Sequence, residues 1–159
     1  MMKNIVLARI DDRLIHGQVV TSWVKHTDAT SIVIADDPLT KNTFMQRLLR
    51  AAAPQGITVH ILTREEAVNY LTGEPVAGEN IILLVKVPEY IEALLDGGVV
   101  MNKVILGGMG AKEGRKRFNR NVSASPEEVE AIKRILGRGV EMFYQLVPEE
   151  RAEDVKKLI

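Results

Sequence analysis

Short apolar runs rich in valine, isoleucine and leucine recur along the 159-residue chain, and polar stretches separate them. Near-continuous apolar runs of this length are typical of strands that are buried on both faces, as in a parallel sheet. The pattern predicts six strands, at residues 5–10, 31–35, 57–62, 81–87, 103–106 and 140–146.

Amphipathic segments with helix-start signals lie between these runs. Thr63 followed by Glu66 is a capping-box pattern, and Ser125 followed by Pro126 combines an N-cap with a proline in the first helical turn. Helices are predicted to begin near residue 19 and to cover residues 43–52, 63–71, 88–96 and 125–137. A last helix is expected to begin at Pro148 and to dock three apolar residues on the sheet, namely Val155, Leu158 and Ile159.

Strands that alternate with helices indicate crossover connections and a mostly parallel sheet. We therefore predict a single domain, residues 1–159, of the α/β class, with an open, mostly parallel twisted sheet and helices on both of its faces. A closed β/α barrel would need about 250 residues. Residues 107–125 form the longest stretch without a strand or helix pattern, and we expect them to be a long loop.

Composition narrows the possible functions. Lys plus Arg and Asp plus Glu number 21 each, so no overall positive field favours binding to nucleic acid or to a membrane surface. The chain has no cysteine, which excludes disulfides and thiolate metal sites, and its three histidines lack the spacing of a zinc site. No apolar run approaches the ~20 residues of a transmembrane helix, and the N-terminus lacks a signal-peptide pattern. We expect a protein that uses no metal and no other cofactor.

Candidate chemistry concentrates at residues 9–18, where the first predicted strand runs into a helix. The carboxyl ends of strands are where open α/β sheets usually bind ligands. The charged and nucleophilic residues here are Arg9, Asp11, Asp12, Arg13 and His16. Backbone N–H groups at the helix start could point at an anion, and those groups belong to Leu14, Ile15, His16, Gly17 and Gln18. Arg13 would neutralise such an anion, and Arg9 would assist.

His16 is a candidate nucleophile for a phosphoryl group. Asp11 or Asp12 could accept a hydrogen bond from one imidazole nitrogen, which would set the tautomer and leave the other nitrogen free to attack. Gly17 would keep side-chain bulk away from the direction of attack. The alternative is a hydrogen-bonded, inert histidine at a helix start, which is the commoner role for an arbitrary histidine.

Three further residues end neighbouring strands and are expected to line the same crevice: Asp36, Gly107 and Gly108. Asp37 is predicted to be the N-cap residue before Pro38. The pair Asp36 and Asp37 could instead bind Mg²⁺ together with Asp11 or Asp12, but extra negative charge would oppose a phosphate. The glycine run at residues 107–110 is either a loop whose amides approach a phosphate or a partner, or a flexible turn.

Residues 112–120 form a basic segment that holds Lys112, Arg115, Lys116, Arg117 and Arg120. Such a segment is most often a solvated loop, and its more specific interpretation is a docking patch for an acidic partner. Phe118 would anchor such a contact or hold the loop on the core.

The stretch from Arg9 to Val19 strongly resembles the signature of the IIB components of the mannose/fructose/sorbose family of the bacterial phosphotransferase system for sugar uptake. Other segments resemble landmarks of the same family in the same order, so the resemblance covers almost the whole chain. They are Val87-Pro88, Gly97-Gly98-Val99, Gly107-Gly108-Met109 and Arg138-Gly139-Val140-Glu141.

This resemblance implies a phosphoryl carrier with an open, mostly parallel sheet. Such IIB proteins take a phosphoryl group from a phosphohistidine on a IIA partner and pass it to a sugar that membrane IIC and IID partners translocate. Carried over by the motif, His16 is the phosphorylated residue, Asp11 and Arg13 support it, and the family's phosphoryl-bearing atom is Nδ1. The implied place is the cytoplasm, docked at the inner face of the cell membrane.

The resemblance leaves the sugar open among mannose, fructose, sorbose and amino sugars, with a slight preference for mannose or an N-acetylated amino sugar. Some relatives have an arginine near the position of Gln145, and its absence here puts a phosphate role for the last strand in doubt. Two other classes of function are compatible with the residues. They are a non-enzymatic module that binds a nucleotide or phosphate beside residues 107–110, and a scaffold subunit with a structural histidine.

Overall fold

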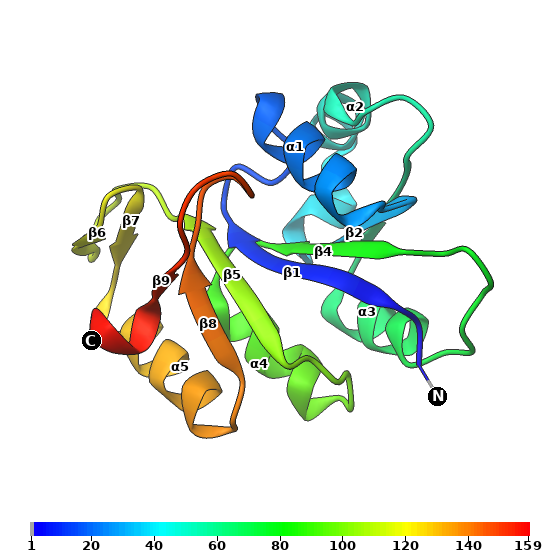
Figure 1. Cartoon of the computed structure of the whole chain (residues 1–159). Coiled ribbons are helices and arrows are strands. Elements are labelled where there is room, and N and C mark those ends of the chain that lie inside the picture. The colour runs from blue at the N-terminus through cyan, green and yellow to red at the C-terminus, as the bar shows by residue number, and fades with distance from the viewer. Residues whose placement is uncertain (1) are drawn as a thin grey trace.

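The computed structural model describes residues 2–159, and within them seven strands form one twisted sheet in the order β3-β2-β4-β1-β5-β8-β9 (Figure 1). The strands are β1 (Ile5–Asp11), β2 (Ser31–Ala35), β3 (Thr58–Leu62), β4 (Ile81–Val85), β5 (Lys103–Gly108), β8 (Glu141–Tyr144) and β9 (Glu153–Asp154). Neighbouring strands are parallel except β9, which pairs with β8 in the antiparallel sense. All six predicted strands are confirmed, with ends that differ by one or two residues.

Helices cover both faces of this sheet, as predicted. They are α1 (Gly17–Thr27), α2 (Thr43–Ala52), α3 (Arg64–Leu71), α4 (Pro88–Asp96) and α5 (Pro126–Gly137). Figure 1 shows α1 and α2 together on one side of the sheet and the other three on the opposite side. Each layer has its own core: Trp23 and Leu49 are buried in one, and Ile91 and Ile132 in the other. The apolar strands are therefore buried on both faces, which explains their near-continuous apolar sequence.

The local helix-start signals have the predicted geometry. The Thr63 hydroxyl accepts from the Glu66 N–H, and the Glu66 carboxylate accepts from the Thr63 N–H. Ser125 and Glu128 form the same reciprocal pair at the start of α5. These caps satisfy backbone donors that have no partner inside the helix, so short-range sequence was sufficient to predict them. No helix within residues 2–159 is long and apolar enough to cross a membrane.

The predicted loop at residues 107–125 contains a β-hairpin instead, made of β6 (Lys116–Asn119) and β7 (Val122–Ala124). Val122 and Ala124 alternate towards the core and are buried, and Phe118 packs against the same core. Met109 binds the hairpin through two backbone hydrogen bonds, which join its N–H to the Asn121 carbonyl and its carbonyl to the Ser123 N–H. The hairpin therefore stands on the carboxyl end of β5.

The prediction of a helix that begins at Pro148 is wrong. The side-chain amide of Gln145 donates to the carbonyls of Pro148 and Glu150, which holds the chain in a turn. The turn brings β9 back to pair with β8, and only a short 3₁₀ helix, η2 (Val155–Lys157), follows. Val155 is buried as predicted, whereas Ile159 is exposed.

Candidate functional site

The connection between β1 and α1 has a fixed conformation. Leu14 has a φ of +57°, in the left-handed region, which costs about 1–3 kcal/mol for a residue other than glycine. The side chains of Leu14 and Ile15 are buried in the core beneath α1 and α2, and this burial holds the strained backbone in place. His16 follows as the N-cap residue of α1, with Gly17 at a φ of +46° behind it. Leu14 and Ile15, predicted as amide donors, thus contribute anchoring side chains.

Asp11 is the centre of a buried hydrogen-bond network at the end of β1. Its Oδ1 accepts from the backbone N–H and the Nε–H of Arg13, both at 3.1 Å. Its Oδ2 accepts from Arg9 Nη2 at 3.1 Å and from Arg13 Nη2 at 3.3 Å. The carboxylate is fully buried, and two guanidinium groups compensate its charge. The structure therefore brings Asp11 and Arg13 together in a direct ion pair.

The His16 ring faces Asp11 with one nitrogen and the backbone with the other. Nδ1 lies 3.1 Å from the Leu14 carbonyl oxygen, and because a carbonyl only accepts, this hydrogen bond requires a proton on Nδ1. Nε2 lies 3.9 Å from Asp11 Oδ2, is buried, and has no hydrogen-bond partner in the described chain. The side chain is 23% exposed, and this exposure belongs to ring atoms other than Nε2.

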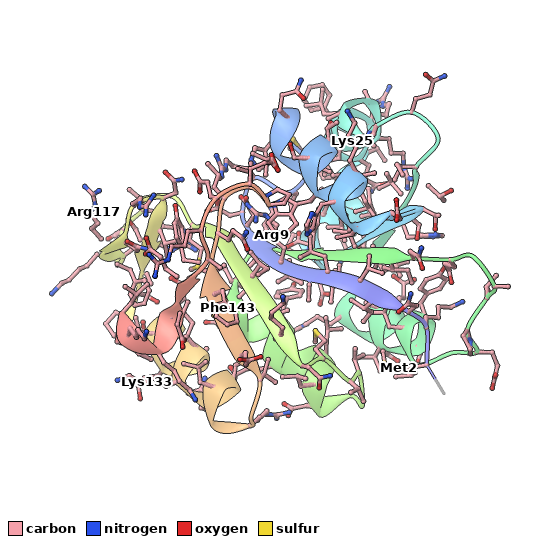
Figure 2. All side chains as sticks on the ribbon, viewed as in Figure 1. Met2, Arg9, Lys25, Arg117, Lys133 and Phe143 are labelled. Atoms are coloured by element: carbon pink, nitrogen blue, oxygen red, sulfur yellow. The ribbon has the colours of Figure 1, made fainter. Side chains whose placement is uncertain are left out.

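Arg9 lies in the interior of the protein beneath Asp11 and is not exposed to solvent. Its side chain is almost completely buried, and Nη1 donates to the Gln145 carbonyl at 2.8 Å. The guanidinium also lies over the Trp23 ring, 5.6 Å from its centroid, and Figure 2 shows Arg9 inside the molecule at the end of β1. Burial lowers the pKa of Arg9, and Asp11 opposes this effect. The predicted contact of Arg9 with an anion is wrong, and Arg13, which is 46% exposed, is the guanidinium that a ligand can reach.

Gly107 and Gly108 provide space for the two guanidinium groups. A Cβ added to Gly107 would lie 2.7 Å from Arg9 Nε and closer still to Cζ and Nη2. A Cβ on Gly108 would lie 2.9 Å from Arg13 Nη2. The structure thus places both glycines beside the network, but side chains occupy the space that a phosphate cradle would need. The sequence contained no signal for this role, because the glycines and the arginines are far apart in the chain.

Asp12, for which the sequence suggested no definite role, connects the site to the hairpin. Its Oδ2 accepts from the Gly110 N–H at 2.8 Å and from Arg115 Nη1 at 3.2 Å. Arg115 also forms a bidentate pair with Glu128, with both hydrogen bonds at 2.9 Å. The hydrogen bond to Glu128 raises the pKa of Arg115. Burial acts to raise the pKa of Glu128, but hydrogen bonds from Arg115 and Ser125 outweigh it and lower that pKa.

The basic segment is therefore not uniformly free to bind a partner. The side chain of Arg115 is buried in the network just described, and Arg120 pairs with Glu153. Lys112, Lys116 and Arg117 are exposed, and they form no ion pair within residues 2–159. Figure 2 shows Arg117 projecting away from the body of the molecule.

Asp36, and not Asp37, caps the turn that follows β2. Asp36 Oδ2 accepts from the Leu39 N–H at 3.0 Å at the start of the 3₁₀ helix η1 (Pro38–Lys41). The Asp37 side chain makes no cap. Its carboxylate instead accepts hydrogen bonds from the backbone N–H and the guanidinium of Arg64. The prediction for Asp37 is wrong because the buried side chain of Asp36 already points at the orphan N–H groups. The part of the chain that the structure describes holds no group of three or more His, Cys, Asp or Glu side chains suited to a metal ion.

A pocket of about 130 Å³ opens beside the loop. Asp12, Arg13 and Leu14 form one wall, Asp36 and Lys86 lie at its base, and η1 and α2 form the opposite wall. Asp36 thus lines the crevice as predicted, whereas Gly107 and Gly108 lie on the other side of the Asp11 network. The arrangement combines a partly exposed imidazole, an exposed guanidinium and a helix N-terminus, a combination that suits an oxyanion.

Known proteins are similar to this chain in sequence. A family model described as "PTS system sorbose subfamily IIB component" matches residues 5–159. The mannose-specific EIIAB component of the PTS system of Escherichia coli K12 is 38% identical over 136 residues, which are 86% of this chain and 42% of that protein. The chain therefore spans less than half the length of this relative. The N-acetylgalactosamine-specific phosphotransferase enzyme IIB component 2 of the same strain is 34% identical and covers 99% of this chain and 100% of its own length.

Solved structures agree with the sequence relatives. The IIBSor domain of the sorbose permease from Klebsiella pneumoniae superposes with a TM-score of 0.91 at 31% identity, over 98% of this chain and 95% of that one. The family match, the relatives and the common fold cover nearly the same residues. The chain therefore belongs to the family of PTS system sorbose subfamily IIB components.

Proposed function

We propose that this protein is a phosphoryl carrier in which His16 accepts a phosphoryl group from a phosphohistidine on a IIA protein and passes it to a sugar that membrane IIC and IID partners translocate. One observation carries the proposal. In a member of this family, His16 stands at the N-terminus of α1 with Nε2 3.9 Å from Asp11 Oδ2, and the exposed Arg13 guanidinium binds the same carboxylate. The reaction class is a protein-Nπ-phosphohistidine–sugar phosphotransferase, acting at the cytoplasmic face of the membrane.

Nδ1 is the accepting atom in this proposal, because Nε2 is buried. The Nδ1 lone pair becomes free when the ring turns away from the Leu14 carbonyl and the proton resides on Nε2. Asp11 Oδ2, 3.9 Å from Nε2, is the acceptor that we propose for Nε2–H in this tautomer. Asp11 then holds the tautomer, as carboxylates do for other reactive histidines.

Transfer exchanges one nitrogen–phosphorus bond for another. The bond on the donor histidine breaks while the bond to His16 Nδ1 forms in line, and Arg13 compensates the charge of the equatorial oxygens. In the second step the Nδ1–phosphorus bond breaks, a sugar hydroxyl oxygen takes the phosphoryl group, and His16 receives the hydroxyl proton. No metal or other cofactor takes part. The relatives are named for mannose, N-acetylgalactosamine, sorbose and fructose, so the proposed acceptor is a hexose or an N-acetylated amino hexose.

Phosphorylation by a IIA donor tests this function. Incubation with a phosphorylated IIA protein should give a label that is labile in acid and stable in base. His16→Ala should abolish it, whereas the matched variants His26→Ala and His60→Ala should retain it. Nitrogen-15 and phosphorus-31 NMR of the labelled protein should locate the phosphoryl group on Nδ1. Labelling of His16→Ala at the wild-type rate would refute the proposal.

A further inference from the structure

Helix α2 presents a row of large apolar side chains to solvent. Phe44 is 63% exposed, Met45 38% and Leu48 49%, and their spacing places them on one face of the helix. Leu49 lies next to this row, one turn after Met45, and its side chain is buried in the core between the helix and the sheet. The exposed row therefore contributes nothing to the core of the described chain, and a concentration of this kind is typical of an interaction site.

Positive charge surrounds this apolar row, although the whole chain is neutral. Residues 38–64 contain no aspartate or glutamate, and neither does α1. Lys41 and Arg47 are exposed and form no ion pair with any residue from 2 to 159. Arg50, by contrast, donates to the Val59 carbonyl. The surface made by η1 and α2 is thus an apolar patch with a cationic rim, and it complements a partner with an apolar centre and a carboxylate rim.

The patch is continuous with the loop that holds His16. Met45 and Leu49 of α2 line the same 130 Å³ pocket as Arg13 and Leu14 of the loop. Figure 1 shows α2 beside α1, at the end of the sheet where β1 runs into α1. A protein that covers the loop and this pocket must therefore also contact the α2 surface.

We propose that the η1–α2 surface, centred on Phe44, Met45 and Leu48, is the docking site for the phosphoryl-donor protein; this inference rests on the proposed function of His16. In-line transfer requires the phosphorus on the donor histidine to approach His16 Nδ1 to within about 3–3.5 Å. A specific interface of about 800 Å² per partner extends well beyond one side chain, so the donor must bind surface next to the loop.

The hairpin on the other side of the loop is a weaker candidate. Two of its cations, Arg115 and Arg120, are bound to acidic residues of this chain, and Arg117 projects away from the body of the molecule (Figure 2). Its groove of about 500 Å³ lies between Phe118 and the α5 residue Val129, and no residue of the His16 loop lines it. Asp12 joins the hairpin side to the loop through Gly110 and the buried Arg115, whereas the α2 surface shares an open pocket with Arg13 and Leu14 of the loop and has unpaired cations beside it.

Two donors separate docking from chemistry. Phosphoramidate is a small phosphoryl donor that needs no docking surface. The phosphorylated IIA part of the Escherichia coli mannose-specific EIIAB component serves as the protein donor. For Phe44→Ser/Leu48→Ser we expect the rate constant kcat/KM with the protein donor to fall about 30-fold, mostly through KM, because both side chains lie at the centre of the patch. Labelling of His16 by phosphoramidate should stay at the wild-type rate.

Charge reversal and two controls complete the experiment. Lys41→Glu/Arg47→Glu should lower the rate with the protein donor by about 10-fold at low salt and by less at high salt. The matched controls change an exposed apolar residue elsewhere, Val100→Ser, and the hairpin cations, Lys116→Glu/Arg117→Glu. Both controls should transfer at the wild-type rate.

The outcomes are distinguishable. The docking inference is overturned if Phe44→Ser/Leu48→Ser transfers normally from the protein donor, if the hairpin variant shows the loss instead, or if phosphoramidate labelling falls in parallel. If neither donor labels His16 in the wild-type protein, the proposed function itself fails, and the docking inference fails with it.

Discussion

A single methyl group at Gly107 tests the buried network beneath His16. The added Cβ of Gly107→Ala would lie 2.7 Å from Arg9 Nε and nearer to Cζ and Nη2, far inside normal contact distance. The guanidinium must therefore shift by roughly 1 Å, since carbon and nitrogen atoms pack at about 3.5–4.0 Å. Arg9 is almost completely buried, so this shift takes place inside the core.

The shift breaks two hydrogen bonds of a buried cation. These are the 3.1 Å bond from Nη2 to Asp11 and the 2.8 Å bond from Nη1 to the Gln145 carbonyl. Hydrogen bonds to charged groups contribute about 1.5–3 kcal/mol each, so the expected loss of unfolding free energy is about 3–6 kcal/mol. Loss of one partner of a buried ion pair costs about 3–5 kcal/mol, which agrees with this range. A typical domain has only about 5–15 kcal/mol in total, so the effect is large.

Urea unfolding at neutral pH measures this loss, and Gly137→Ala is the matched control. A Cβ at Gly137 meets nothing within 4 Å, so we expect that variant to be neutral or slightly stabilised. Arg9→Met removes the group with which the methyl collides, so the losses in Gly107→Ala/Arg9→Met should be clearly less than additive. An unfolding free energy for Gly107→Ala within about 0.5 kcal/mol of the wild type would show that the guanidinium does not pack there.

Three further changes test neighbouring parts of the structure. Arg13→Met should slow phosphorylation by a IIA donor about 10-fold or more, and it should lower the unfolding free energy by about 1.5–3 kcal/mol because the buried Asp11 carboxylate loses a charged partner; an unchanged rate would contradict its role. The lowered pKa of Glu128 stabilises the fold above its unfolded pKa of about 4.3, and this stabilisation disappears as the pH falls through the lowered value. The midpoint temperatures of thermal unfolding of the wild type and Glu128→Gln should therefore differ at pH 7 and converge towards pH 3. A difference in midpoint that is the same at both pH values would count against the ion pair of Glu128 with Arg115. Asp12→Ala should speed amide exchange of Gly110 by about 10-fold, because its N–H loses the acceptor; unchanged exchange would mean that the hairpin is held elsewhere.

Local signals in the sequence were sufficient for most of the fold. The predicted strands were apolar runs, and the central ones, such as β2 and β4, are buried along their whole length. Each capping box joined residues only three positions apart, such as Thr63 and Glu66. His16 could be singled out as a candidate because a polar motif directly follows a buried strand. Predictions failed where two neighbouring residues were equally suited to one role, as Asp36 and Asp37 were to the cap after β2. They also failed where side-chain hydrogen bonds set the backbone conformation, as those of Gln145 do for the turn after β8.

The sequence by itself determined the alternation of strands and helices, the helix caps and the position of the charged loop, because these depend on residues within a few positions of one another. The tertiary structure decided which charges meet. Arg9 binds a carbonyl 136 positions away, and Asp12 binds Arg115, 103 positions away. The parallel sheet brings these partners together because it sets the carboxyl ends of β1, β5 and β8 side by side. Only that arrangement makes Arg9 a buried support for Asp11 and leaves Arg13 as the exposed cation on the same carboxylate.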